Sequence, residues 1–548
     1  MANVLFVVPE IRLDGKPLHF PFWAGILGAI VEQKGGNVAV LDLNALRMDF
    51  NGNELSEELI IAEINRNDWD LIGIGGLTTT YKRIKELSTI IKKASPNSLL
   101  VAGGGFCTYN PDEIFKLIPE IDLITIGEGE ETFAELYDQI ENKTNDFLSV
   151  NGMCVRTDDG FQFTAPRALV SDLNTIPLPN YDLFESDIYF RYSPIAFSLE
   201  SINSKRRASV VWERGCPRGC TFCSHNGMSR IDLQNIYGKG DRKEGEKLVR
   251  ASDKENDTFQ LPARWPTPRY AVDNIKVLKE KFDVDFISIL DENMTSNRKW
   301  TQEFCKLYKE EGLDKTVKWG TLGDAPSIAT FPDLVKIMKD AGCCYISCGF
   351  ESASDKVQKE DIGKGQNKSH LVKTIYAMKE AGLTPISTFM IGNPFENIDD
   401  LMETVYFWIE HGIEVDPFIC TPYVGSPIFY NNKTFVLQQY DERLRLVKGK
   451  EDQYADEIPK WELEALDTFM QECGDATEYT ATVSQYFTIP ELIAIKRFMH
   501  KKEVSRLLQM AHRRFEETGL PQWTHKEKWN KFCNVCKSKE NLMLKLNN

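Results

Sequence analysis

The stretch SVVWERGCPRGCTFC (209–223) joins an apolar run to a loop that carries three cysteines. Residues 209–214 predict a strand, and Cys216, Cys220 and Cys223 follow it with the spacing C-x3-C-x2-C. Three thiolates on one short loop can bind three irons of a cubane iron–sulfur cluster. The fourth iron then keeps an open coordination site, which a metal needs in order to bind a substrate. The glycines before two of the cysteines let the loop wrap closely around such a cluster.

Two simpler interpretations of this loop stay open. The cysteines could form a structural zinc site, with His225 as the fourth ligand, or they could be three unrelated thiols. We favour the cluster because three features agree: the cysteine spacing, the aromatic Phe222 before the last cysteine, and the position of the loop directly after a strand.

The cysteine loop belongs to a block, residues 206–432, in which apolar runs alternate with helical stretches. The predicted strands are 209–214, 285–290, 317–322, 344–350, 384–392 and 416–422. Six strand–helix units in parallel order predict a partial (β/α)6 TIM-like barrel. A polar, charged insert at 228–262 interrupts the block and is predicted to be a loop or lid.

The residues before the barrel predict a second α/β domain. Over 1–150, strands are expected at 4–9, 38–43, 71–76, 99–105 and 123–131. Short strands separated by helices indicate a doubly wound, Rossmann-like parallel sheet. Glycines cluster after the carboxyl ends of these strands, where ligands bind in open α/β sheets. Residues 151–205, rich in Pro, Asn and Asp, predict a linker, and residues 433–548 predict a helical C-terminal domain.

Composition narrows the class of protein. The chain has 548 residues, a formal net charge of -16 and 13 cysteines. The acidic balance disfavours a nucleic-acid partner. No apolar run approaches the roughly 18 residues that a membrane span needs, so a cytoplasmic protein is expected. In such a chain, clustered cysteines favour metal ligation over disulfides.

The cysteine loop resembles the radical S-adenosylmethionine superfamily, whose signature is C-x3-C-x-aromatic-C. The resemblance implies that Cys216, Cys220 and Cys223 hold a 4Fe–4S cluster. The open iron would chelate the amino and carboxyl groups of the methionine moiety, and backbone near Phe222 would touch adenine. An electron from the cluster would break the S–C5′ bond and release a 5′-deoxyadenosyl radical.

Further barrel segments resemble the same family, among them ISILDENM (287–294), GFESASDKV (349–357) and FMIGNPFENIDDLMETV (389–405). The resemblance implies cofactor contacts from Asp291, Glu351, Ser352, Gly392 and Pro394. A solvated acidic turn is the alternative for the first of these. Many relatives carry an Arg after the third strand that can pair with the methionine carboxylate. Here Gly323 or Asp324 stands in that neighbourhood, so the carboxylate partner is not identified.

The N-terminal domain joined to such a barrel is similar to the cobalamin-dependent branch of the superfamily. This resemblance implies cobalamin contacts from Thr78, Thr79, Gly103, Gly104, Gly105, Glu128 and Gly129. The glycines would let backbone approach the ligand, the threonines would offer hydroxyls to its nucleotide tail, and the GEGE turn at 128–131 would face the corrin edge. The D-x-H-x-x-G motif is missing, as it is in members that bind cobalamin without a histidine on cobalt. A scaffold domain that binds nothing is the alternative.

The leading hypothesis is a cobalamin-dependent radical S-adenosylmethionine methyltransferase that acts on an unactivated carbon of a small molecule or natural product. An external electron donor of the flavodoxin or ferredoxin type would be its partner. One alternative is a cyclase, oxidase or rearrangement enzyme without methyl transfer, and another is a non-catalytic corrinoid or iron–sulfur binding protein. Cys533 and Cys536 are interpreted as unpaired thiols rather than a second metal site, and Cys343, Cys344 and Cys348 as core residues.

Overall fold

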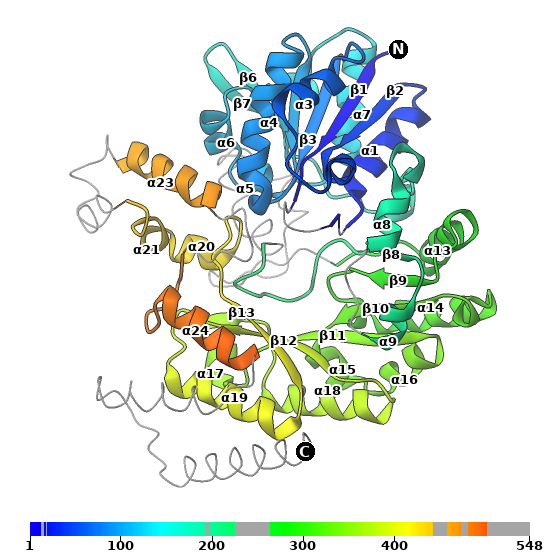
Figure 1. Cartoon of the computed structure of the whole chain (residues 1–548), viewed down its shortest axis with the longest axis vertical. Coiled ribbons are helices and arrows are strands. Elements are labelled where there is room, and N and C mark those ends of the chain that lie inside the picture. Colours follow the sequence, from blue (N-terminus) through cyan, green and yellow to red (C-terminus); the bar gives the residue numbers. More distant parts are fainter. Residues whose placement is uncertain are drawn as a thin grey trace.

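The computed structural model builds the chain around two sheets, one above the other in Figure 1. It describes residues 1–11, 16–17, 19–192, 198–224, 263–441, 458–472 and 481–500. The upper sheet comes from the N-terminal part of the chain and the lower sheet from the middle part. The predicted α/β fold class, a Rossmann-like domain followed by a partial parallel barrel, is confirmed.

The N-terminal sheet has a parallel core in the order β2-β1-β3-β4-β5. Its strands are β1 (Asn3–Val8), β2 (Asn37–Asp42), β3 (Leu71–Gly75), β4 (Leu99–Gly103) and β5 (Leu123–Thr125). Strand β1 shows why the sheet is covered on both faces. Phe6 joins a core cluster with α1 (Phe22–Gln33) and α7 (Glu130–Glu141), whereas Leu5 and Val7 join one with α3 (Glu57–Ile64) and α4 (Tyr81–Ala94). Successive side chains of a strand point to opposite faces, so both faces of this strand are buried.

The sheet continues past residue 150 into the region predicted as a linker. Strands β6 (Met153–Thr157) and β7 (Gly160–Phe163) form an antiparallel hairpin that pairs with β5. The Asp158–Asp159–Gly160 turn joins two strands that are too short and too polar to show clear periodicity. The rest of this region packs on α1 and the barrel, with Tyr189 of α8 (Ser186–Tyr192) donating to Asp42 Oδ2 at 2.7 Å.

The barrel sheet is parallel throughout and follows chain order, β8 to β13. Its strands are β8 (Arg207–Val210), β9 (Phe286–Ile289), β10 (Lys318–Gly323), β11 (Cys343–Glu351), β12 (Ile386–Ile391) and β13 (Glu414–Ile419). The helices between them include α13 (Pro268–Phe282), α14 (Arg298–Glu310), α15 (Ala325–Thr330), α16 (Asp333–Asp340), α18 (Lys368–Glu380) and α19 (Ile398–His411). The first strand is shorter than predicted, because residues 211–214 leave the sheet and lead into the cysteine loop. Cys343, Cys344 and Cys348 of β11 are buried, as predicted.

The described part of the C-terminal region is helical, but its helices pack on two different bodies. Helix α23 (Ile458–Glu472) lies against α4, where Tyr81 and Lys85 donate to Asp467 at 2.6 and 2.8 Å. Helix α24 (Ile489–His500) packs on the barrel, with Leu492 close to Gly392. Cys533, Cys536, His225 and the predicted lid at 228–262 lie outside the described residues.

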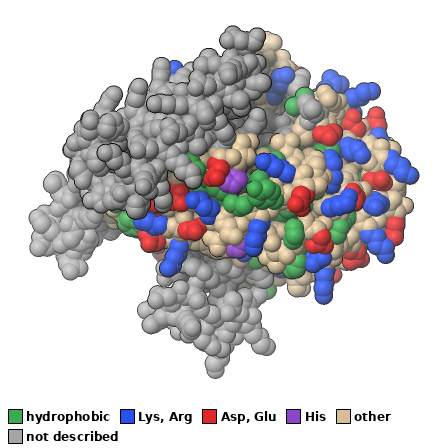
Figure 2. Space-filling model, turned by 90° about the horizontal axis from the view of Figure 1, so that it is seen from below, with side chains coloured by type: hydrophobic (Ala, Val, Ile, Leu, Met, Phe, Trp, Pro, Cys, Tyr) green, Lys and Arg blue, Asp and Glu red, His purple; other side chains and the backbone are tan. Residues whose placement is uncertain are grey.

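The surface bears on the expectations about partners. On the face shown in Figure 2, basic and acidic side chains are interspersed over the described part of the molecule. In the ranges that the structure describes, no helix is long and apolar enough to cross a membrane.

The carboxyl-terminal edges of the two sheets face each other. Thr78, which follows β3, donates to the carbonyl oxygen of Val424, which follows β13, at 3.3 Å. Tyr109, at the end of α5 (Gly105–Tyr109), packs its ring on Gly425, where an added Cβ would lie 2.1 Å from a ring carbon. Ligands bind at this edge in open α/β sheets, so the two candidate ligand-binding edges are brought together.

The contact between Tyr109 and Gly425 predicts a measurable stability difference between two glycine variants. Both Gly425 (φ +99) and Gly382 (φ +74) have positive φ, but an added Cβ at Gly382 meets nothing within 4 Å. Gly382→Ala should therefore lower the free energy of unfolding by only about 1 kcal/mol, because of its backbone conformation. Gly425→Ala should lower it by about 1–3 kcal/mol more, because the added methyl group overpacks the contact with Tyr109. Thermal unfolding of the two purified variants measures the difference, and equal midpoints would contradict the interface.

Candidate functional site

The cysteine loop lies between the two sheets, directly after β8. It is anchored where Arg214 and Arg264 exchange backbone hydrogen bonds of 3.0 and 2.9 Å, and Gly215 turns the chain with a φ of +82. Cys220 is buried and Cys216 is partly exposed, and burial raises the pKa of the Cys216 thiol to about 12. Three thiols on one short loop are the donor set that a cubane cluster needs.

The arrangement of ligands differs from that of a single-ion site. Among the residues that the structure describes, no three His, Cys, Asp or Glu side chains converge as they would on one metal ion. In a cubane cluster each cysteine binds a different iron, so the three sulfurs stay apart. The loop places its three cysteines within eight positions of each other, on the edge that faces the N-terminal domain.

Asp291 holds the base of the cysteine loop. This fully buried side chain follows β9, and its Oδ1 accepts from the backbone N–H groups of Trp212 and Glu213 at 2.6 and 3.0 Å. Glu213 in turn accepts from the Asn293 N–H at 2.7 Å. Burial raises the pKa of Asp291 to about 6 and that of Glu213 to about 9. The alternative of a solvated turn is wrong for Asp291, and the part played by Glu213 was not predicted.

Glu351 lies beside the loop in a buried ion pair. It ends β11 with a φ of +59, and its Oε1 accepts from Lys364 Nζ at 2.8 Å. Lys364 also donates to the Gly349 carbonyl oxygen at 2.6 Å. The neighbouring Ser352 points elsewhere, because its hydroxyl hydrogen-bonds to Thr404 Oγ1 of α19 at 3.1 Å. The structure therefore brings Glu351 to the cysteine loop, together with a lysine that was not predicted.

An arginine does stand near the end of the third strand, but it comes from the cysteine loop. Arg218 pairs through Nε with Asp324, which follows β10, and its Nη2 donates to Ser327 Oγ at 3.1 Å. The resemblance places this arginine directly after the third strand. In the structure, the guanidinium beside the end of β10 belongs to the cysteine loop instead.

The segment after β12 forms a tight turn. Gly392 has a φ of +80, and its N–H donates to Glu396 Oε2 at 2.7 Å. The Pro394 carbonyl oxygen accepts from the Gln485 N–H at 3.1 Å, so the C-terminal region helps to fix this turn. Phe222 is partly buried against the core that joins the N-terminal domain to the C-terminal helices. The turn is thus held by hydrogen bonds, and Phe222, the predicted adenine contact, by packing. Whether either contacts a cofactor stays a prediction.

The glycines after β4 are required by the fold itself. Gly104 has a φ of +92, and a Cβ there would lie 2.4 Å from the Gly76 carbonyl oxygen. A Cβ at Gly103 would lie 2.6 Å from Thr125 Oγ1, and one at Gly105 would lie 3.1 Å from the Tyr109 ring. Close approach of the backbone at Gly76 therefore accounts for Gly104, whereas Gly103 and Gly105 lie against side chains of β5 and α5. Their contact with a ligand stays a prediction.

Other residues at this edge differ in their surroundings. Thr78 is buried and bonded to the barrel, and Thr79 beside it is partly exposed. Leu77 exposes 62% of its surface at this edge.

The acidic turn after β5 forms ion pairs with two arginines of the barrel domain. Glu128 pairs with Arg264 and accepts from the Val170 N–H at 2.8 Å, while Glu130 pairs with Arg214 at 2.7 Å. The Glu128 carboxylate, expected to face a corrin, is thus engaged by the barrel. Residues 128 and 130 connect the N-terminal domain to the two arginines that anchor the cysteine loop, and Gly129 lies between them, directly before α7.

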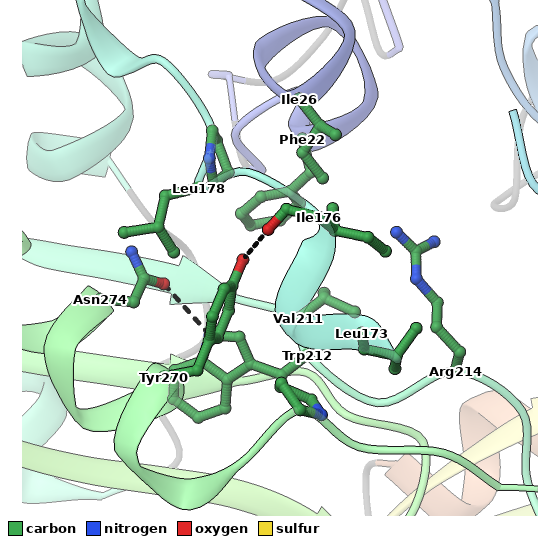
Figure 3. Close-up of a pocket in the computed structure, with 12 residues that line it drawn as sticks. Phe22, Ile26, Leu173, Ile176, Leu178, Val211, Trp212, Arg214, Tyr270 and Asn274 are labelled. Carbon is green, nitrogen blue, oxygen red and sulfur yellow. Dashed lines mark hydrogen bonds between the residues drawn. The ribbon is translucent and has the colours of Figure 1, made fainter. Parts of the chain in front are cut away.

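A small cavity lies behind the cysteine loop, between α1, the linker region and α13 (Figure 3). Its volume is about 30 Å³, which is room for only one or two water molecules. Trp212 donates to Asn274 Oδ1 at 3.1 Å and Tyr270 to the Ile176 carbonyl oxygen at 3.0 Å across its wall. The cavity is too small for a cofactor, and it marks the packed base on which the loop rests.

Two family models match the chain in separate regions. The model described as B12 binding domain matches residues 12–137, and the model described as Radical SAM superfamily matches residues 210–407. The first region contains β1 to β5, and the second begins at the end of β8, just before the cysteine loop.

Known proteins resemble the chain across both regions. An uncharacterized methyltransferase, PH0819, from Pyrococcus horikoshii is 28% identical over 381 residues, which is 68% of this chain and 72% of that protein. An anaerobic magnesium-protoporphyrin IX monomethyl ester cyclase from Rubrivivax gelatinosus is 27% identical over 412 residues, 73% of this chain and 64% of that protein. The solved structure of the radical S-adenosylmethionine methyltransferase TsrM from Kitasatospora setae, with its tryptophan substrate and an S-adenosylmethionine analogue bound, shares the fold with a TM-score of 0.57 and 16% identity. The match covers 79% of this chain and 76% of that one.

The buried Glu396 predicts a dependence of stability on pH. Burial raises its pKa from 4.5 to about 8, only partly offset by hydrogen bonds from Asn393 and Gly392. The folded protein therefore keeps a proton that the unfolded chain has released, and this contribution to stability is lost as the pH rises from about 5 through about 8. Glu396→Gln cannot ionise, so its melting temperature should fall less over this range. Glu360→Gln, at an exposed position, is the control, and equal declines in both variants would contradict the assignment.

Proposed function

The chain belongs to the cobalamin-dependent radical S-adenosylmethionine enzymes, and we propose that it transfers a methyl group to an unactivated carbon of a small-molecule substrate. Its cofactors are a 4Fe–4S cluster, S-adenosylmethionine and cobalamin. These cofactors supply the electron, the radical and the carried methyl group when they are bound. The chain's own part is to bind them, orient them and keep water from the reacting carbon.

We assign the cluster to Cys216, Cys220 and Cys223. Glu351 is placed to accept a hydrogen bond from the amino group or a ribose hydroxyl of S-adenosylmethionine. Backbone at Phe222, Gly392 and Pro394 borders the adenine in this proposal. Asp291 acts as a positioning residue, because its contacts run to the backbone of the loop. Ser352 acts through packing, because its hydroxyl is turned to α19.

In the N-terminal domain we assign cobalamin to the edge formed by the segments after β3 and β4. Thr79 and backbone at Gly103, Gly104 and Gly105 line this edge, and the exposed Leu77 adds an apolar surface. Thr78, Glu128 and Gly129 belong to segments that connect this edge to the barrel, so their part in the proposal is to fix its position.

One observation carries the proposal: the candidate cobalamin edge and the cysteine loop face each other, and ion pairs connect the two domains beside them. Glu130 binds Arg214, two residues before the first cysteine, and Glu128 binds Arg264. Methyl transfer through cobalamin to a substrate radical needs the two cofactors on opposite sides of one substrate. The apposition of the two edges meets this geometric requirement.

The cluster assignment predicts the behaviour of a triple cysteine variant. After anaerobic reconstitution with iron and sulfide, the native chain should be brown and should release 5′-deoxyadenosine from S-adenosylmethionine with dithionite. The variant Cys216→Ala/Cys220→Ala/Cys223→Ala should lose the brown absorbance and the 5′-deoxyadenosine, because no ligands remain for the irons. Iron and sulfide analysis with product chromatography measures both.

The matched control is Cys305→Ala. Cys305 is a buried cysteine of α14 in the same barrel, where burial raises the pKa of its thiol and the charge of Lys309 lowers it. It should keep iron, sulfide and activity. Iron and sulfide retained in the triple variant at the native level would refute the cysteine assignment.

A cyclase is the second candidate, since a magnesium-protoporphyrin ester cyclase covers 73% of this chain at 27% identity. The two reactions differ in product mass. With methyl-labelled S-adenosylmethionine, a flavodoxin or ferredoxin as electron donor and candidate substrates, a methyltransferase gives a product that gains one labelled CH2. Conversion without label in the product would favour the cyclase. If cluster-loaded protein released neither 5′-deoxyadenosine nor S-adenosylhomocysteine, that result would favour a non-catalytic binding protein.

A further inference from the structure

A second segment of the barrel is docked on the cysteine loop. The π-helix η8 (Gln358–Ile362) follows α17 (Asp355–Val357), and the Ile362 carbonyl oxygen accepts from the Thr221 N–H at 2.9 Å. Gly363 turns the chain with a φ of +68, and an added Cβ there would lie 3.2 Å from the Gly219 carbonyl oxygen. The two backbones therefore meet on either side of Cys220. π-Helical turns often lie at functional sites, and this one delivers Lys364.

Lys364 and Glu351 form an ion pair that is shielded from water. Each side chain exposes 10% of its surface, and Nζ lies 2.8 Å from Oε1. Lys364 directly follows Gly363, whose backbone packs on Gly219 beside Cys220. The pair thus places two opposite charges next to the backbone that carries this cysteine. Charges buried in this way are screened far less than charges on the surface.

We infer that the Lys364–Glu351 pair sets the reduction potential of the iron–sulfur cluster. Reduction adds one negative charge to the cluster, so a nearby cation favours the reduced form and a nearby carboxylate opposes it. Net charge and solvent exposure around a cluster are established controls of its potential. Lys364 therefore makes the cluster easier to reduce, and Glu351 moderates this effect.

The inference rests on the proposed ligation of the cluster by Cys220, but not on methyl transfer. A purely structural role is the competing account, because Lys364 also donates to the Gly349 carbonyl oxygen and Gln366 donates to the Phe350 carbonyl oxygen at 2.9 Å. A structural lysine would change stability and cluster loading. It would not make the two members of the pair change the potential in opposite directions.

The test is a redox titration of the reconstituted full-length chain without added S-adenosylmethionine. Dithionite and mediator dyes set the potential, and electron paramagnetic resonance measures the reduced cluster. At a fixed potential, Lys364→Gln should lower the ratio of reduced to oxidised cluster by about tenfold, which for one electron is a midpoint shift of about 59 mV. Glu351→Gln should raise the ratio, and the double variant should lie between the two single variants.

Two controls separate charge from packing. Lys364→Arg keeps the charge and should keep the native midpoint. Lys356→Gln removes another lysine of the segment that contains η8. The Lys356 side chain is 42% exposed and pairs with Asp400 at 2.8 Å, so this variant should also leave the midpoint potential unchanged.

The outcomes are distinct. A native midpoint in Lys364→Gln with full iron and sulfide, or shifts of the same sign in both single variants, would overturn the inference. If Lys364→Gln fails to hold a cluster, Glu351→Gln still tests the inference. An unchanged or lower midpoint potential in Glu351→Gln would also overturn it. Absence of iron and sulfide from the native chain would instead count against the proposed ligation by Cys220.

Discussion

The candidate site depends on two backbone N–H groups held by one buried carboxylate. Trp212 and Glu213 have left β8 and have no neighbouring strand to bond to, yet both donate to Asp291 Oδ1. Buried N–H groups without an acceptor are costly, so this carboxylate allows the chain to leave the sheet at that point. The departure is what turns a strand into a cysteine loop.

The same loop is fixed from three other directions, each by a different kind of contact. The acidic turn after β5 binds Arg214 from the N-terminal domain. Asp324 binds Arg218 from the end of β10. Backbone bonds from Thr221 reach Ile362 and Ile428 on later barrel segments. A loop held from every side loses little further conformational freedom when it binds a cluster, which favours binding.

The sequence predicted most of the strands because they are short apolar runs in sheets that helices cover, and β1 is an example with both faces buried. It also predicted the cysteines, since their chemistry depends on local spacing. It missed the β6–β7 hairpin, whose strands are short and half polar. It could not find Lys364 or Glu213, because nothing local marks a lysine or glutamate as buried. Their partners lie 13 and 80 positions away in the chain.

The charged groups around the cysteine loop show why sequence patterns miss a residue such as Lys364. The chain is acidic overall, yet the groups around the cysteine loop include Arg214, Arg218 and Lys364, each paired with a carboxylate from the end of a strand or the turn after it. In each pair the carboxylate offsets part of the desolvation cost of holding a cation near the thiols. Sequence patterns describe neighbours along the chain, whereas this balance exists only between strand ends that the barrel brings together.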